Sequence, residues 1–343
     1  MRHLLNTLYV TTQGAYLARD GETVAVRVEK ETRLRVPLHT LGGIICFGQV
    51  SCSPPLMQLC AERGVRISFL SEYGKFWARV EGPVSGNVLL RREQYRWSDD
   101  ADKSAEIARA VITAKVANCR TVLLRVLRDH PEIAGGAEVK AAGDTLERSL
   151  SLLQKPLPLD TVRGIEGDTA RQYFAVFDHL ILTQKKEFFF RERTRRPPLD
   201  NMNALLSFLY TLLAHDVRSA LETVGLDPAV GFMHRDRPGR PSLALDLMEE
   251  LRPVLADRLA LSLVNRQQIK GKGFKTTETG AVVMDDETRK ELLVAYQKRK
   301  QEELQHPFIN EKVALGLLPF VQSMLLSRYL RGDLDGYPPY FWK

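Results

Sequence analysis

The spacing of apolar residues changes at about residue 95 of the chain. Before that point, apolar positions form short runs or alternate with polar ones, which is the pattern of β-strands. Such runs are Leu5–Val10, Ala15–Ala18, Val24–Val28, Leu34–Leu38, Ile44–Phe47, Val65–Leu70 and Phe76–Val80. Asp20-Gly21 predicts a tight hairpin turn, and one short helix is predicted from Pro54 to Arg63. Residues 1–95 are therefore expected to form a small β-rich domain.

From Asp102 onward, the apolar residues recur at helical spacing, as in Ala105–Arg128. Further helices are predicted at Asp144–Leu153, Gly164–Leu182, Asn201–Val224, Leu243–Leu263, Asp285–Leu304 and Lys312–Leu330. Gly225 and Gly332 follow two of these helices, as C-terminal signals should, and Pro253 is expected to kink or divide its helix. The pattern predicts an α+β protein in which residues 96–343 form a larger, all-helical domain.

Composition places the chain among ordinary globular proteins. It has 343 residues, 44% of them hydrophobic and 27% charged, and this length favours two domains. No apolar run reaches the ~20 residues of a membrane span, and the N-terminus lacks the pattern of a secretory signal. The four cysteines form no Cys-x-x-Cys pair, which argues against a zinc knuckle or a thioredoxin-like site. We expect a cytoplasmic protein with reduced cysteines and no membrane contact.

Positive charge is concentrated locally. The net charge of +7 divides almost evenly between the two predicted domains, but three basic runs stand out in the second: Gln184–Arg196, Leu259–Thr277 and Arg289–Lys300. The middle run holds Arg266 and three lysines that we call the lysine loop: Lys270, Lys272 and Lys275. Gly271 and Gly273 predict a loop whose backbone can approach a phosphate chain. Any single run is typical of a solvated face, whereas three in one domain favour a polyanionic partner, DNA or RNA.

The segment Gly231–Pro253, GFMHRDRPGRPSLALDLMEELRP, carries the clearest chemistry. Asp246 and Glu249 are three residues apart, so both are expected on one side of a helix. His234 precedes a Pro/Gly turn that lets its imidazole meet these carboxylates. Asp246 has apolar neighbours, so its burial would require a cation or hydrogen-bond donors. Carboxylate oxygens with one imidazole suit Mg²⁺ or Mn²⁺ better than structural zinc.

A further carboxylate, Glu166, lies between Gly164 and Gly167. This segment is expected to be a helix start, where the backbone packs closely against another element. Taken alone, this segment favours the interpretation of Glu166 as an ordinary helix-start residue that the helix dipole stabilises.

Three segments together resemble a known family. They are IEGDTARQYF, NMNALLSFLYTLL and GFMHRDRPGRPSLALDLMEELRP, in this order. The chain resembles, over essentially its whole length, the CRISPR-associated adaptation endonuclease/integrase family, the first-numbered Cas protein, and is most similar to subtype I-C members. The resemblance implies a metal-dependent DNase that works with a small ferredoxin-like partner subunit. The implied enzyme joins the 3′-hydroxyl ends of short DNA fragments to the repeat of a CRISPR array.

The resemblance also implies roles for particular residues. Glu166, His234 and Glu249 match the family's metal ligands for Mg²⁺ or Mn²⁺, and Asp246 matches an additional acidic residue beside them. Family members form homodimers, largely through the N-terminal β domain. We expect the following residues to contact DNA: Arg235, Arg240, Arg266 and the lysine loop.

Two other functions were weighed against this one. A non-catalytic nucleic-acid scaffold with structural carboxylates would bind DNA without metal and would join no strands. A metalloprotease is disfavoured because the chain has no His-Glu-x-x-His motif, and one histidine among carboxylates is a poor zinc site.

Overall fold

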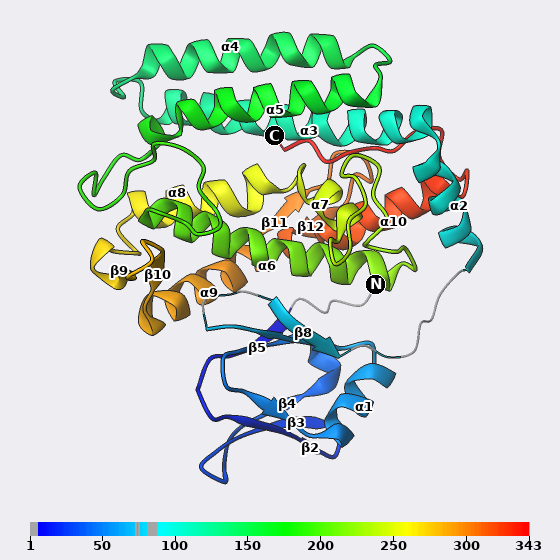
Figure 1. Cartoon of the computed structure of the whole chain (residues 1–343), viewed down its shortest axis with the longest axis vertical. Helices are drawn as coiled ribbons and strands as arrows, with labels where there is room; N and C mark the ends of the chain where they lie inside the picture. Colours follow the sequence, from blue (N-terminus) through cyan, green and yellow to red (C-terminus); the bar gives the residue numbers. More distant parts are fainter. Residues whose placement is uncertain (1–5, 73, 75, 81, 83–87, 343) are drawn as a thin grey trace. The chain divides into compact units, whose positions relative to one another are not determined.

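The computed structural model describes residues 6–72, 74, 76–80, 82 and 88–342 (Figure 1). The chain divides into two compact units: Met1–Gly86 with Met284–Glu302, and Asn87–Val283 with Glu303–Lys343. The boundary expected after residue 95 therefore falls inside helix α2 (Val88–Asp99), which belongs to the second unit. Helix α9 (Asp286–Gln301) belongs to the first unit, where its Arg289 donates a hydrogen bond to the carbonyl of Glu72.

The first unit contains two four-stranded sheets, drawn in blue in Figure 1. One has the order β1-β5-β7-β8, with bounds Asn6–Val10, Leu41–Phe47, Arg66–Leu70 and Phe76–Val80. The other has the order β4-β3-β2-β6, with bounds Glu31–Pro37, Thr23–Val28, Tyr16–Asp20 and Ser51–Cys52. The predicted strands are confirmed to within a few residues; Leu5, at the start of the first, lies outside the described residues.

Helix α1 (Pro54–Glu62) follows its prediction closely because its N-terminus has strong signals. The Ser53 side chain caps it by accepting a hydrogen bond from the Leu56 amide, and proline occupies the first turn. Its buried face joins a core of aliphatic residues that includes Leu17, Ile44 and Ile67.

The second unit is mainly helical, as predicted. Its α-helices are α2, α3 (Ala101–Asp129), α4 (Gly136–Leu153), α5 (Leu159–Ala175), α6 (Asn201–Thr223), α7 (Ser242–Met248), α8 (Arg258–Asn265) and α10 (Leu318–Leu330). Helices α3, α4 and α5 lie side by side, and α6 packs against α7 and α10 (Figure 1). Aspartates cap the two longest helices: Asp100 accepts from two amides of α3, and Asp200 accepts from one amide of α6.

Short strands interrupt the helices, so the expectation of an all-helical second domain was wrong in this detail. Strands β9 (Phe274–Thr276) and β10 (Val282–Met284) pair with each other, as do β11 (Glu303–Gln305) and β12 (Lys312–Ala314). Three-residue strands are too short to show a period of two in the sequence. Brief 3-10 turns complete the chain at Leu38–Thr40, Phe177–Leu180, Gly271–Gly273 and Leu315–Leu317.

Pro253 divides its helix as predicted, in a specific way. Between α7 and α8 lies a single π-helical turn, η3 (Pro253–Asp257), in which the Arg258 amide donates to the Pro253 carbonyl. Proline has no amide hydrogen, so it cannot bond to the carbonyl four residues earlier, and the wider turn accommodates this loss.

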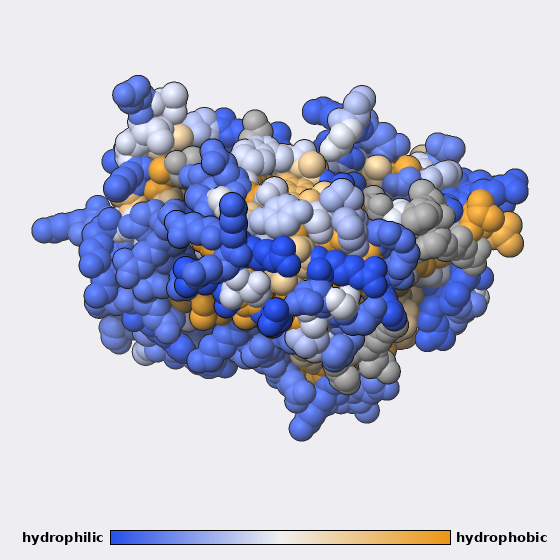
Figure 2. Space-filling model, turned by 90° about the horizontal axis from the view of Figure 1, so that it is seen from below, coloured by the Kyte–Doolittle hydropathy of each residue, from blue (hydrophilic) through white to orange (hydrophobic). Residues whose placement is uncertain are grey.

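The face shown in Figure 2 is mainly hydrophilic, with its apolar side chains in small patches. Among the described residues, no helix combines the length and the apolar character that crossing a membrane requires. The cysteines Cys46, Cys52, Cys60 and Cys119 are all free, as expected.

Candidate active site

Asp246 organises the loop that carries His234. Its carboxylate is 2% exposed on α7; Oδ2 accepts from the amides of Phe232 at 2.6 Å and Met233 at 2.9 Å. Oδ1 accepts from the His234 amide at 2.9 Å and lies 2.5 Å from the same residue's Nδ1. The predicted meeting of His234 with Asp246 is confirmed, and these donors offset the cost of burying the carboxylate.

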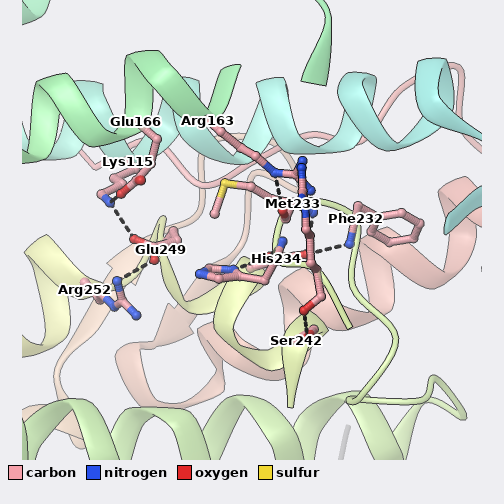
Figure 3. A network of polar contacts seen from close by, with 11 residues as sticks. Lys115, Arg163, Glu166, Phe232, Met233, His234, Ser242, Glu249 and Arg252 are labelled. Atoms are coloured by element: carbon pink, nitrogen blue, oxygen red, sulfur yellow. Dashed lines mark hydrogen bonds and ion pairs between the residues drawn. The ribbon is translucent and has the colours of Figure 1, made fainter. Parts of the chain in front are cut away.

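This contact orients the histidine. Facing a carboxylate oxygen, Nδ1 of His234 is the donor in this contact, and Nε2 is the ring nitrogen left to bind a metal. The ring points toward Glu249 (Figure 3). Gly231 is required beside it, since a Cβ there would lie 2.7 Å from Asp246 Oδ2 and 2.8 Å from the Ser242 backbone.

Glu166 and Glu249 meet at a lysine. Lys115, on α3, forms an ion pair with Glu166 Oε1 and another, 2.7 Å long, with Glu249 Oε2, while Arg252 pairs with Glu249 Oε1 (Figure 3). The Glu249 side chain is only 3% exposed. Burial raises the pKa of Glu249, but Arg252 and Lys115 outweigh it and bring that pKa to about 2. For Lys115, burial lowers the pKa, but the attraction of Glu249 and Glu166 outweighs burial, so the pKa of Lys115 is raised overall.

Helix α5 supports both halves of the site. Glu166 lies in the middle of α5 rather than at a helix start, because the helix already begins at Leu159. The expected close packing at Gly164 and Gly167 is also wrong, since a Cβ at either would meet nothing within 4 Å. One turn before Glu166, Arg163 donates to the carbonyl of Met233 at 2.7 Å, so the same helix holds the histidine loop.

The two carboxylates of the 246–249 pair do not share one partner. Asp246 faces the loop and Glu249 faces Lys115 and Arg252. Glu250 lies apart from both, and its buried carboxyl accepts from Tyr337 at 2.5 Å and from the Tyr340 amide at 2.6 Å. Burial raises the pKa of Glu250 to about 7.

Three basic residues of the site were missed in the sequence: Lys115, Arg163 and Arg252. A signal for the first was available, because Lys115 stands four residues after Val111 on the apolar stripe of its helix. A lysine on such a stripe needs a buried acidic partner. Nothing in the local sequence pattern distinguishes Arg163 and Arg252 from arginines on the surface.

A pocket of about 440 Å³ opens beside Lys115 and Glu166. It is rich in arginine, and its basic lining residues are Lys115, Arg171, Arg191, Arg193, Arg195 and Arg252. Three of them come from the basic run Gln184–Arg196, which is therefore brought next to the carboxylates. At the pocket wall, Asp257 accepts from Tyr210 at 2.6 Å, and burial raises the pKa of Asp257 to about 6.

The other basic runs behave differently. Arg266 and the lysine loop are exposed, but a Cβ on Gly271 would lie 2.3 Å from Glu187 Cβ. The backbone at Gly271 thus packs against a side chain and is not open to a phosphate. In the third run, Arg289 is 1% exposed and pairs with Asp286 at 2.5 Å, so this run does not form a uniformly free basic face.

Two arginines near the histidine had been expected to contact DNA. The Arg235 side chain is 74% exposed, 3.8 Å from Asp160, and Arg240 is half-buried. Neither belongs to the residues that line the pocket.

The donor set of the site bears on whether it can hold a divalent ion. Within the described ranges, no three His, Cys, Asp or Glu side chains converge as a ready metal site. The chemistry nevertheless fits: two glutamates meet here, and the imidazole beside them can offer Nε2. Glu249 Oε2 is buried, and its contact among the described residues is the ammonium of Lys115, 2.7 Å away. An oxygen in this state is a suitable ligand for a hard cation.

Comparison with known proteins gives a consistent result. Residues 8–298 match the family model described as CRISPR associated protein Cas1. A CRISPR-associated endonuclease Cas1 of Chlorobaculum tepidum is 54% identical over 343 residues, and one of Rhodospirillum rubrum is 54% identical over 347, each covering all of both chains.

Solved structures share the fold. A Cas1 protein from Thermotoga maritima has a TM-score of 0.82 at 24% identity, covering 96% of this chain and 99% of that one. A casposase bound to integration product has a TM-score of 0.83 at 22% identity, covering 98% and 94%. The predicted order of a β-rich domain and a helical domain is thereby confirmed. Because the family model matches most of this chain and relatives are 54% identical to it, the chain belongs to the Cas1 family of CRISPR-associated proteins.

Proposed function

We propose that this chain is a DNA endonuclease and integrase of CRISPR adaptation that depends on Mg²⁺ or Mn²⁺. It joins the 3′-hydroxyl ends of short foreign DNA fragments to the repeat of a CRISPR array. The observation that carries the proposal is the meeting of Glu166 and Glu249, with His234 beside them, at the edge of an arginine-lined pocket. The names of the relatives, CRISPR-associated endonucleases, support the same chemistry.

The reaction is a transesterification. The 3′-hydroxyl of the fragment loses its proton as its oxygen forms a bond to phosphorus in the repeat. The bond from that phosphorus to the repeat's 3′ oxygen breaks, and this oxygen takes up a proton to become a new 3′-hydroxyl. Water in place of the fragment gives hydrolysis, so both activities need one site. Glu166, Glu249 and Nε2 of His234 would hold the ion, which when bound supplies Lewis-acid stabilisation of the charge developing at the phosphate.

The remaining residues prepare the site. Asp246 keeps the proton on Nδ1 of His234, so Nε2 is available as a ligand. Arg252 keeps Glu249 ionised in its buried position. The arginines of the pocket provide fixed positive charge for the DNA backbone, and guanidinium groups bind phosphate in two-point contacts.

The partners follow from the same proposal. The chain would act as a homodimer formed through its β-rich unit, bound to a small ferredoxin-like subunit and to double-stranded DNA. A Cas6-RT-Cas1–Cas2 complex is among the structures with this fold. Membership of subtype I-C and a cytoplasmic location also stay predictions, and the genes adjacent to this one test the first.

An integration assay tests the proposal. Purified chain and its partner subunit are incubated with a short DNA fragment and a supercoiled repeat-bearing plasmid, with Mn²⁺, Mg²⁺ or a chelator. We expect joined products only with a divalent ion, and none from Glu166→Gln, His234→Ala or Glu249→Gln.

An exposed glutamate on α4 gives the matched control, Glu138→Gln, which should retain wild-type joining. Full activity in any of the three site variants, at matched circular dichroism, would refute the site. Metal-independent DNA binding without joining under any divalent ion would favour the scaffold instead.

A further inference from the structure

Lys115 is an unusual neighbour for two glutamates assigned to a metal. It projects from the middle of α3, its side chain is 9% exposed, and its ammonium contacts one oxygen of Glu166 and one of Glu249. These contacts bridge side chains from two segments that lie far apart in the sequence. The ammonium therefore occupies the position between the carboxylates that a shared cation requires (Figure 3).

Both oxygens of Glu249 are in contact with positive charge, Oε2 with Lys115 and Oε1 with Arg252. Mg²⁺ binds carboxylate oxygens at about 2.0–2.1 Å, so an ion on Oε2 would lie very close to an ammonium 2.7 Å from the same atom. Like charges at such a separation in a buried site repel strongly. The lysine and a divalent ion would therefore compete for the two glutamates.

We propose that Lys115 is an internal counter-ion that holds Glu166 and Glu249 together until a divalent ion displaces its ammonium. The inference rests on the proposed function, since it concerns the same site. It also accounts for the lack of three converging ligands among the described residues, because two of them are held by a lysine instead.

Lys115 is the cation that leaves, for two structural reasons. Arg252 is held from a second side, with its guanidinium 5.0 Å from the centre of the Tyr210 ring. Lys115 in contrast has a flexible stem and lines the pocket of about 440 Å³, which gives the released ammonium space. A monovalent ion carries no more charge than the lysine, so only a divalent ion gains by the exchange.

Manganese binding to the full-length, chelator-treated protein tests this directly. Titration calorimetry with MnCl₂ compares wild type with Lys115→Met, Lys115→Arg and the control Lys103→Met, a lysine on the same helix whose side chain is 45% exposed. We expect about tenfold tighter binding for Lys115→Met, which corresponds to about 1.4 kcal/mol. Lys115→Arg should bind about tenfold more weakly, because its guanidinium holds both glutamates in place, and Lys103→Met should match wild type.

Thermal denaturation supplies a second reading. In chelator, Lys115→Met should melt below wild type because Glu249 loses a buried partner, whereas added Mn²⁺ should raise its melting temperature more than that of wild type. Equal or weaker Mn²⁺ binding by Lys115→Met overturns the inference. If Lys115→Met does not fold, Lys115→Arg decides: affinity equal to or above wild type overturns it.

The Mn²⁺ titrations also distinguish a failure of the metal-site proposal from a failure of the role proposed for Lys115. If wild type binds Mn²⁺ and Glu249→Gln does not, the site stands and only the role of Lys115 is in question. If none of the proteins binds Mn²⁺, the metal site and the inference both fall.

Discussion

Asp246→Asn separates a positioning role for Asp246 from a role as metal ligand. The substitution keeps the shape of the side chain but replaces one acceptor oxygen with an amide group that can only donate. Asp246 makes four contacts, two on each oxygen, with the amides of Phe232, Met233 and His234 and with Nδ1 of His234. The remaining oxygen of asparagine can accept two of these hydrogen bonds. Its new amide group would face the other two donors, with which it cannot form hydrogen bonds as an acceptor.

The expected cost follows from this geometry. A hydrogen bond to a charged group contributes about 1.5–3 kcal/mol, so the loss of two predicts about 3–6 kcal/mol of destabilisation. A domain has about 5–15 kcal/mol of stability in total, so the variant should fold but unfold at much lower urea. The His234 ring should also lose its preference for a proton on Nδ1.

Two measurements check the prediction, both in chelator so that no ion contributes. Urea unfolding followed by circular dichroism gives the change in unfolding free energy, and nitrogen-15 spectra of the imidazole report its tautomer. Asp236→Asn is the matched control, since Asp236 is an exposed residue of the same loop. Its unfolding free energy should stay within about 0.5 kcal/mol of wild type.

An unfolding free energy for Asp246→Asn that equals the control would refute this reasoning. Combined with weaker Mn²⁺ binding, such a result would assign Asp246 to the ion itself. Lower metal-free stability together with an altered His234 tautomer would instead support positioning.

Other changes have equally definite outcomes. Burial raises the pKa of Asp257 from 3.8 to about 6, so its contribution to stability is full below pH 4 and is lost as pH rises to about 6. Asp257→Asn should remove that part of the pH dependence, about 3 kcal/mol between pH 4 and 7 in urea unfolding, and an unchanged profile would contradict the assignment. Gly231→Ala places a methyl group within 2.7 Å of a carboxylate oxygen, so a loss of about 1–3 kcal/mol is expected in thermal unfolding, and wild-type stability would show that the loop adapts freely. Neutralising the lysine loop should weaken DNA binding and flatten its salt dependence; an unchanged slope would mean that these exposed lysines touch no phosphate.

The sequence was most informative where burial imposes a period. Most strands of the first unit and the helices α3, α6 and α9 lie close to their predicted bounds, because apolar residues recur on the face that each turns to a core. The three-residue strands β9 to β12 are too short to show such a period, and they were missed. Helix α5 was misplaced at its start because Leu159–Val162 carries no capping side chain: Pro158 precedes it without a side-chain cap.

The site was predicted in part for a similar reason. The His234 loop and Asp246 are neighbours in sequence, and their contact followed from a turn and an apolar helix. Lys115 and Glu166 are 51 residues apart, and the ion pair between them depends on how α3 packs against α5. Local patterns do not encode such pairings, although they do show that a lysine on a buried stripe needs a partner.

The π-helical turn η3 gives the chain a tolerance for changes in length. In a regular helix, adding or removing one residue turns everything beyond it by about 100°, which would exchange buried and exposed faces. The π-helical turn contains one residue more than the corresponding α-helical turn. The additional residue is contained within this turn, so α7 before it and α8 after it keep their buried faces. Deleting Leu255 should therefore leave the buried faces of α7 and α8 in place. Deleting one residue in the middle of α6 should instead rotate the second half of that helix and expose its buried face.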